Sequence, residues 1–219
     1  MMRLGSRVGT RPYQRRRRAP LIAVVTVLAA AALVTWTAVL VNASGPDRGR
    51  TCPTPTSGPV PGQVLPPGAL NGVAPIPPAA VKVRVLNAGG QRGQANLVAA
   101  QFDDLKFTEA APPANDPYFP NGDMECSGQV RFGPAGEGAA STVALILPCA
   151  ELVRDTRPDD TVDVAVGTAF GDLNPVRAAQ EALDQLSDPA GGSADGSAAP
   201  GPPPTVDPAV LAEARGRTC

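Results

Sequence analysis

Histidine is absent from this chain of 219 residues. Without it, neither a Ser-His-Asp triad nor a Cys-His pair can form, and a common zinc ligand is missing. The four cysteines include no C-x-x-C pair, and the chain has no G-x-S-x-G nucleophile elbow. We therefore expect no enzymatic activity, no metal and no cofactor.

Basic residues are scarce outside the N-terminus. Residues 1–20 carry seven arginines and no acidic side chain, and the rest of the chain holds 12 basic and 20 acidic residues, a net charge of −8. Such an acidic body lacks the basic face that would release counterions from DNA or RNA. The sequence therefore argues against nucleic-acid binding.

The one long apolar run is Leu21–Val41, 21 residues without a charge. At a rise of about 1.5 Å per residue, a helix of this length crosses a hydrocarbon core of about 30 Å. Because four arginines (15–18) precede the run, we expect the N-terminus in the cytoplasm and the remainder outside the cell membrane. A cleaved signal peptide is the alternative, but the run exceeds the usual apolar stretch of about 7 to 15 residues, which favours a single-pass anchor.

Composition divides the chain into segments with different expected structures. Ten prolines with almost no periodicity predict an extended spacer before the domain, and a segment rich in Gly, Ser and Pro predicts a flexible linker after it. The expected segments are a basic cytoplasmic tail (1–20), a transmembrane helix (21–41), a proline-rich linker (42–80), one domain (81–172), a helix (173–187), a disordered linker (188–206) and a short C-terminal helix (207–219).

The domain segment has the pattern of a small α/β protein. Alternating apolar residues predict four strands, and apolar residues at helical spacing predict two helices. The strands are expected at 81–87, 106–110, 129–134 and 161–170, and the helices at 93–107 and 137–153. The order β-α-β-β-α-β predicts a two-layer α/β (α+β) domain with both helices on one face of the sheet. A shift of 45 residues aligns Val85 with Val130 and Gly93 with Gly138, so each half is expected to be strand, glycine turn, helix, strand.

All four cysteines follow the apolar run, on the side where disulfides persist. In the predicted topology the helix 137–153 returns beside the start of the third strand, which brings Cys149 near Cys126. We expect a disulfide between them, with two buried free thiols as the alternative. A second disulfide between Cys52 and Cys219 is one hypothesis, and intermolecular pairing or free thiols fit the sequence equally well.

A glycine-rich turn lies between the first strand and the first helix, in VLNAGGQRGQA (85–95). It misses the dinucleotide fingerprint G-x-G-x-x-G by one glycine, and a domain this small has no second nucleotide-binding half. We therefore expect Gly89, Gly90 and Gly93 to form a tight turn. In the alternative, Arg92 and free N–H groups at the helix start hold a carboxylate or phosphate of an anionic wall polymer.

Two aromatic residues, Tyr118 and Phe119, lie in the loop NDPYFPNGD (115–123). They form either an exposed recognition patch or a plug for the open edge of a small core. The acidic pairs Asp103-Asp104 and Asp159-Asp160 are expected to be solvated, because glycoside hydrolysis needs two carboxylates that face each other across about 5 to 9 Å.

The stretch VKVRVLNAGGQRGQANLVAAQF…FTEAAPPAN…QVRFGPAGEGAASTVALILP…DDTVDVAVGTAF resembles the LytR C-terminal domain of actinobacterial envelope proteins over about residues 81–172. The shared pattern is a V-x-V-L-N strand, a small-residue turn ending in G-x-A, a helix, and a strand ending in F-G-P before a second helix. The apolar run, the NDPYFPNGD loop and the positions of Cys126 and Cys149 add a resemblance to envelope-integrity members of that family.

This resemblance implies a non-catalytic role in envelope integrity and in the permeability barrier. The catalytic LytR-CpsA-Psr domain that often precedes the module is absent here. Two hypotheses follow for the extracytoplasmic domain: it binds envelope proteins as a scaffold, or it binds a cell-wall glycan such as peptidoglycan or arabinogalactan.

Overall fold

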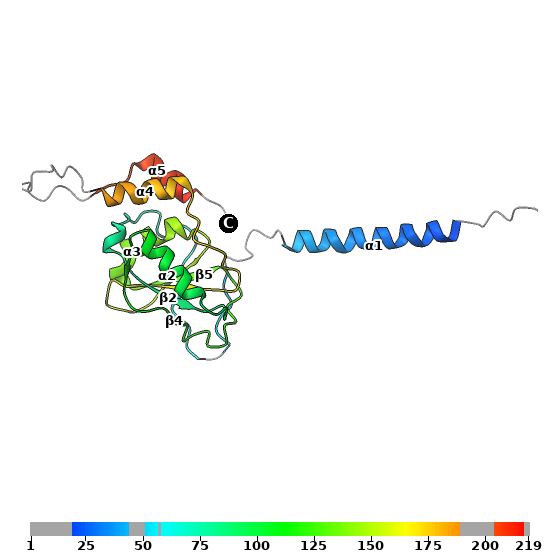
Figure 1. Cartoon of the computed structure of the whole chain (residues 1–219), viewed down its shortest axis with the longest axis horizontal. Helices are drawn as coiled ribbons and strands as arrows, with labels where there is room; N and C mark the ends of the chain where they lie inside the picture. The colour runs from blue at the N-terminus through cyan, green and yellow to red at the C-terminus, as the bar shows by residue number, and fades with distance from the viewer. Residues whose placement is uncertain (1–18, 44–50, 57, 189–203, 217–219) are drawn as a thin grey trace, which may run out of the picture. The chain divides into compact units, whose positions relative to one another are not determined.

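A computed structural model of the chain describes residues 19–43, 51–56, 58–188 and 204–216 (Figure 1). The chain divides into two units, residues 1–45 and 46–219. The first unit contains helix α1 (Ala19–Ala43), which includes the whole predicted apolar run. Within the described residues, no helix is both long enough and apolar enough to cross a membrane. The expected helix is therefore present, and its insertion in a membrane stays a prediction.

The second unit is built on a sheet that has seven strands within the described residues. The strands are β1 (Gln63–Val64), β2 (Lys82–Asn87), β3 (Thr108–Glu109), β4 (Ala114–Asn115), β5 (Gly128–Phe132), β6 (Glu151–Arg154) and β7 (Val162–Val166). Their order is β1-β6-β5-β7-β2-β3, and β4 also pairs with β2. The central strand β7 runs parallel to β2 and antiparallel to β5.

The helices of this unit cover one face of the sheet. They are η1 (Pro78–Ala80), α2 (Gln94–Asp104), η2 (Pro134–Gly136), α3 (Glu137–Ile146), α4 (Arg177–Ser187) and α5 (Pro208–Arg215). Apolar residues of α2, such as Phe102, and of α3, such as Val143, share one core with Val83, Val130 and Val164 of the sheet. The predicted α/β class, with both central helices on one face, is confirmed.

The predicted order of elements is wrong in the second half of the domain. Helix α3 ends at Ile146 instead of residue 153, because Pro148 disfavours helical backbone in the residue before it. Residues Glu151–Arg154 instead form β6, a parallel partner of β5. The 45-residue shift therefore relates β5-α3-β6 to β2-α2-β3, and β7 is an additional strand between the two repeats.

The predicted extended spacer is wrong for residues 51–56 and 58–80, which we call the strap. The strap packs on the domain, because its apolar side chains find partners there: Leu70 lies in the main core, and β1 pairs antiparallel with β6. The Ile76 N–H donates to Thr142 Oγ1 at 2.9 Å, which fixes the strap to α3. Proline-rich backbone suits such a surface path because it has few N–H groups to satisfy.

The C-terminal helices α4 and α5 pack side by side and against Leu145 of α3 (Figure 1). Asp207 caps α5 by accepting a hydrogen bond from Ala209 N at 2.7 Å, and α5 lies within the predicted helix 207–219. Helix α4 begins at Arg177, four positions after the predicted start of the helix 173–187. The predicted linker 188–206 is described only at Asp188 and 204–206, and the basic tail 1–20 only at its last two residues.

The disulfide predictions are both wrong. Cys52 of the strap is bonded to Cys126, so Cys126 does not pair with Cys149 and Cys52 does not pair with Cys219. The early end of α3 moves Cys149 into the turn before β6, whereas Cys126 lies with Cys52 in a second, smaller core. Cys149 is also disulfide-bonded, no described cysteine is free, and Cys219 lies outside the described residues.

Candidate binding groove

The face of the sheet opposite α2 and α3 carries the polar residues of the central strands. Because side chains alternate along a strand, Arg84, Arg131 and Asp163 point away from the main core, whose members are Val83, Val130 and Val164 among others. The start of the strap at Cys52 and the loop 111–127 cover this face, which we call the loop face.

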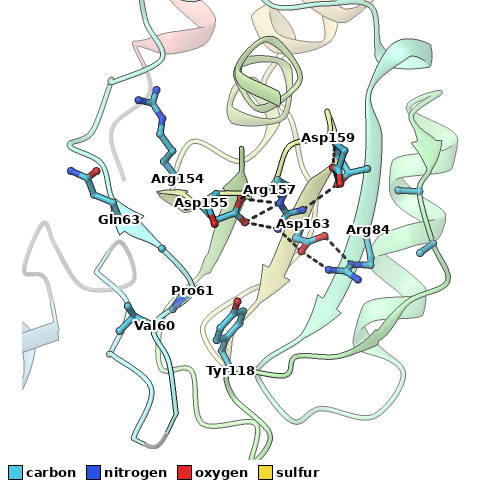
Figure 2. Close-up of a pocket in the computed structure, with 15 residues that line it drawn as sticks. Val60, Pro61, Gln63, Arg84, Tyr118, Arg154, Asp155, Arg157, Asp159 and Asp163 are labelled. Atoms are coloured by element: carbon cyan, nitrogen blue, oxygen red, sulfur yellow. Dashed lines mark hydrogen bonds and ion pairs between the residues drawn. The ribbon is translucent and has the colours of Figure 1, made fainter. Parts of the chain in front are cut away.

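A groove of about 940 Å³ opens on the loop face (Figure 2). One wall is the strap at residues 60–63, and another is the segment 154–157 after β6. The floor includes Arg84 and Asp163, and Tyr118 of the covering loop borders them. Residues far apart in the sequence therefore meet in one open cleft.

Ion pairs hold the floor of the groove in place. Arg84 donates two hydrogen bonds to Asp163, from Nε to Oδ1 at 2.8 Å and from Nη2 to Oδ2 at 2.6 Å. Arg157 Nη2 donates to the same Asp163 Oδ2 at 2.8 Å and to Asp155 Oδ2 at 2.6 Å. Paired guanidinium and carboxylate groups of this geometry are stronger and more rigid than single bonds.

The electrostatic environment keeps these groups charged. Burial alone would raise the pKa of Asp163, but the hydrogen bonds from Arg84 and Arg157 outweigh it, and the net effect lowers that pKa. Burial lowers the pKa of Arg157, and its bonds to Asp163 and Asp155 raise it by more. The two carboxylates accept hydrogen bonds from the arginines and hold them in position.

A second ion pair lies beneath the groove. Arg131 Nη1 donates to Asp116 Oδ2 at 2.6 Å, and the side chains are 1% and 0% exposed. Asp116 Oδ1 accepts hydrogen bonds from the backbone N–H groups of Tyr118 and Phe119, at 2.7 and 3.2 Å. The Arg131 guanidinium carbon is 4.9 Å from the centroid of the Tyr118 ring, a cation–π contact. Tyr118 is therefore held from below, as a fixed wall of the groove.

This buried network continues to the strap. Arg131 Nε donates to Gln129 Oε1 at 2.9 Å, and Gln129 Nε2 donates to Glu151 Oε2 at 2.8 Å. The backbone N–H of Cys52 donates to Glu151 Oε1 at 3.3 Å. The loop that carries Tyr118 and the strap that forms the opposite wall are thus joined both by hydrogen bonds and by the Cys52–Cys126 disulfide.

The aromatic pair predicted from the sequence divides between the two proposed roles. Phe119 is 2% exposed and belongs to the small core with Met124, so it acts as the plug. Tyr118 is half-buried and lines the groove. Its hydroxyl points towards the Asp163 end of the floor in Figure 2.

The glycine turn is structural, as its favoured interpretation predicts. Gly90 and Gly93 have left-handed φ values of 73° and 76°. A Cβ on Gly89 would lie 2.6 Å from the backbone carbon of Gly167, so the turn packs directly on the end of β7. Asn87 Oδ1 accepts from Gly90 N at 3.0 Å, which occupies one of the N–H groups offered to an anion. Arg92 is exposed and does not line the groove.

The acidic pairs are solvated, as expected. Asp103 and Asp104 are exposed, and Asp160 makes a surface ion pair with Lys82 in which both side chains are 50% exposed. Asp159 is exposed as well, and it caps Thr161 at the rim of the groove. Within the described residues, no cluster of three metal-ligating side chains is present.

Sequence reasoning missed the floor of the groove, although a pattern for it exists. In VKVRV and VDVAV, Arg84 and Asp163 occupy the positions between core valines. The strands β2 and β7 are parallel neighbours with these two residues in register. Opposite charges at such positions of two half-buried strands indicate a pair on the face away from the core.

Comparisons with known proteins place the chain in a family. Residues 80–170 match the family model described as LytR cell envelope-related transcriptional attenuator. The cell envelope integrity protein Cei of Mycobacterium tuberculosis is 35% identical over 214 residues, which cover 95% of this chain and 93% of that protein. The chain belongs to the Cei family.

A solved structure of similar sequence supports the Cei-family fold. It is the soluble domain of a conserved hypothetical secreted protein from Mycobacterium marinum, 37% identical, with a TM-score of 0.61, and the match covers 72% of this chain and 98% of that one. Membership of the Cei family confirms the resemblance to the LytR C-terminal domain and supports an envelope-associated role. None of these descriptions states a reaction.

Proposed function

We propose that this Cei-family protein is a membrane-anchored, non-catalytic binding protein that supports the integrity and the permeability barrier of the cell envelope. The observation that carries the proposal is the groove on the loop face, whose side chains are fixed in place by ion pairs from below. A preformed cleft with a few fixed polar groups is the usual form of a binding site.

The proposed anchor is Leu21–Val41, with the N-terminus in the cytoplasm and the domain outside. The arginines at 15–18 support this orientation, because cytoplasmic flanks of a span are rich in basic residues. The Cys52–Cys126 disulfide supports an oxidising location for the domain. Fusing a reporter that is active only outside the membrane to the C-terminus tests the orientation, and activity of a cytoplasmic reporter there would contradict it.

The non-catalytic role is supported by the chemistry of the groove. Two of its three carboxylates, Asp155 and Asp163, are bonded to arginines, and the whole chain has no histidine to act as a general base. The binding partner is then either another envelope protein or a cell-wall glycan.

Complementation tests the proposed function. In cells that lack the gene, uptake of a normally excluded dye is expected to rise, and the full-length chain is expected to restore the barrier. A chain with the run 21–41 replaced by a cleavable signal peptide is expected to restore it less well, because the domain is no longer held at the membrane. If dye uptake is unchanged in cells that lack the gene, the proposed function is contradicted.

A further inference from the structure

Arg84 on the floor of the groove has hydrogen-bonding capacity left over. It uses Nε and Nη2 on Asp163, and its side chain is still 41% exposed. Arg154 also borders the groove, but its Nη2 donates to Glu137 of α3, and its side chain points away from Arg84 and Asp163 (Figure 2). Arg84 therefore presents donors to whatever fills the groove.

Acceptors border the same cleft. Asp159 is exposed at the rim, with Oδ1 bonded to the backbone N–H of Thr161 at 3.0 Å. A ligand in the groove thus meets donors and acceptors together, which is what hydroxyl groups require.

The charges that face the groove have no positive excess. Two are basic and three are acidic, since Arg154 is paired with Glu137: Arg84, Arg157, Asp155, Asp159 and Asp163. An anionic polymer would approach the three carboxylates as closely as the two guanidinium groups, so the cleft has no excess of positive charge to attract it. The balance favours a ligand without net charge.

Tyr118 supplies an apolar surface among these polar groups. Its ring is half-buried and rests on Arg131, so it loses little freedom when a ligand packs against it. Tyrosine offers a rigid amphipathic surface of this kind at low entropic cost. A sugar ring has the matching chemistry, with an apolar C–H face and hydroxyl groups around its edge.

We propose that the groove on the loop face binds a neutral cell-wall polysaccharide segment, with Tyr118 packed against a sugar ring and Arg84 donating hydrogen bonds to its oxygens. This inference rests on the proposed binding role and names its ligand. The sequence suggested the glycine turn and Arg92 as a contact for a wall polymer, and the groove is now proposed as that contact instead. The volume of about 940 Å³ lies within the range of about 300–1,000 Å³ common for ligand sites.

Calorimetric titration of the full-length protein in detergent tests the assignment. The probes are a neutral oligosaccharide prepared from arabinogalactan and, for comparison, a phosphate-bearing teichoic acid. We expect binding of the neutral probe, with an affinity nearly unchanged between about 50 and 500 mM salt, because no net charge is neutralised. Teichoic acid is expected to bind at least about tenfold more weakly.

Variants locate the site. Tyr118→Ala is expected to weaken binding at least about tenfold and Arg84→Gln about threefold or more, whereas Tyr118→Phe keeps the ring and most of the affinity. Arg92→Ala is the matched control, an exposed arginine outside the groove, and should bind like the wild type. Melting temperatures verify that each variant is folded, and Arg84→Gln serves if Tyr118→Ala is not.

Three results would overturn the assignment: no binding of the neutral probe, binding that survives both Tyr118→Ala and Arg84→Gln, or salt-sensitive binding of teichoic acid alone that Arg92→Ala abolishes. If the neutral probe does not bind while the gene still restores the barrier in cells, only the ligand is wrong and the proposed function stands.

Discussion

Arg131 and Asp116 form an ion pair that solvent does not reach, with Nη1 and Oδ2 2.6 Å apart and the side chains 1% and 0% exposed. Burial lowers the pKa of Arg131, and the charge of Asp116 opposes that shift. Such a pair is costly to bury and more costly to break, because removing one partner leaves the other charge without compensation. Here the pair also fixes the backbone of Tyr118.

Breaking this pair is expected to destabilise the domain strongly. Asp116→Asn leaves the guanidinium of Arg131 buried without a counter-charge, and we expect the free energy of unfolding to fall by about 3–5 kcal/mol. Asp160→Asn is the matched control, because its partner Lys82 is half exposed and the expected loss is about 0–1 kcal/mol. Urea denaturation measures both, and equal losses would show that the buried pair has no special role.

The Cys52–Cys126 disulfide is expected to be the main support of the strap. It joins residues 74 positions apart, and the chain-entropy account gives about 4 kcal/mol for a loop of that size. The double variant Cys52→Ser and Cys126→Ser, kept oxidised so that Cys149 stays bonded, should lose about that much stability. Limited proteolysis should then cleave first within residues 51–62. An unchanged cleavage pattern would mean that the strap holds without the bond.

The glycine turn is expected to respond to substitution through folding. Gly89→Ala would place a Cβ 2.6 Å from the backbone of Gly167, and we expect a loss of about 1–3 kcal/mol. Gly171→Ala is the control, since nothing lies within 4 Å of its Cβ position. A stable Gly89→Ala protein that no longer binds glycan would favour a ligand role for the turn instead.

Acid should weaken the floor of the groove. The folded state holds the pKa of Asp163 below its usual value of about 3.9, so the stability that this carboxylate contributes is fully present above about pH 4 and is lost as pH falls through the folded pKa. Asp163→Asn removes the titrating group. The stability difference between the wild type and this variant should be constant near neutral pH and should shrink below about pH 4. If the stability difference between the two proteins instead widens on acidification, the pKa of Asp163 is not lowered by folding.

Much of the domain could be predicted because its signals are local. Alternating valines mark β2 and β7, and helical spacing marks α2, which all form where expected. The end of α3 could also have been predicted from the sequence, because Pro148 stops the helix and residues 151–154 can then form a strand. The predicted helix 137–153 followed the apolar residues on both sides of Pro148 and did not allow for the effect of that proline.

The strap and the disulfide could not be predicted in the same way, because they depend on distant contacts. Prolines indicate an extended chain but not whether it packs on a surface, and the partners of Leu70 in the core come from segments far along the chain. Cys52 and Cys126 meet because the strap crosses the loop face, and no spacing rule contains that path. The groove has the same origin, since its walls come from the strap and from segments far along the chain.

The bond between Cys52 and Cys126 also has a mechanical consequence. It closes residues 53–125 into a covalent loop, so a pull on the chain from before Cys52 passes directly to Cys126, two residues ahead of β5. The strap wall of the groove and Tyr118 lie inside that loop and carry none of the tension. A tether on the N-terminal side can therefore be loaded without pulling this wall away from the sheet.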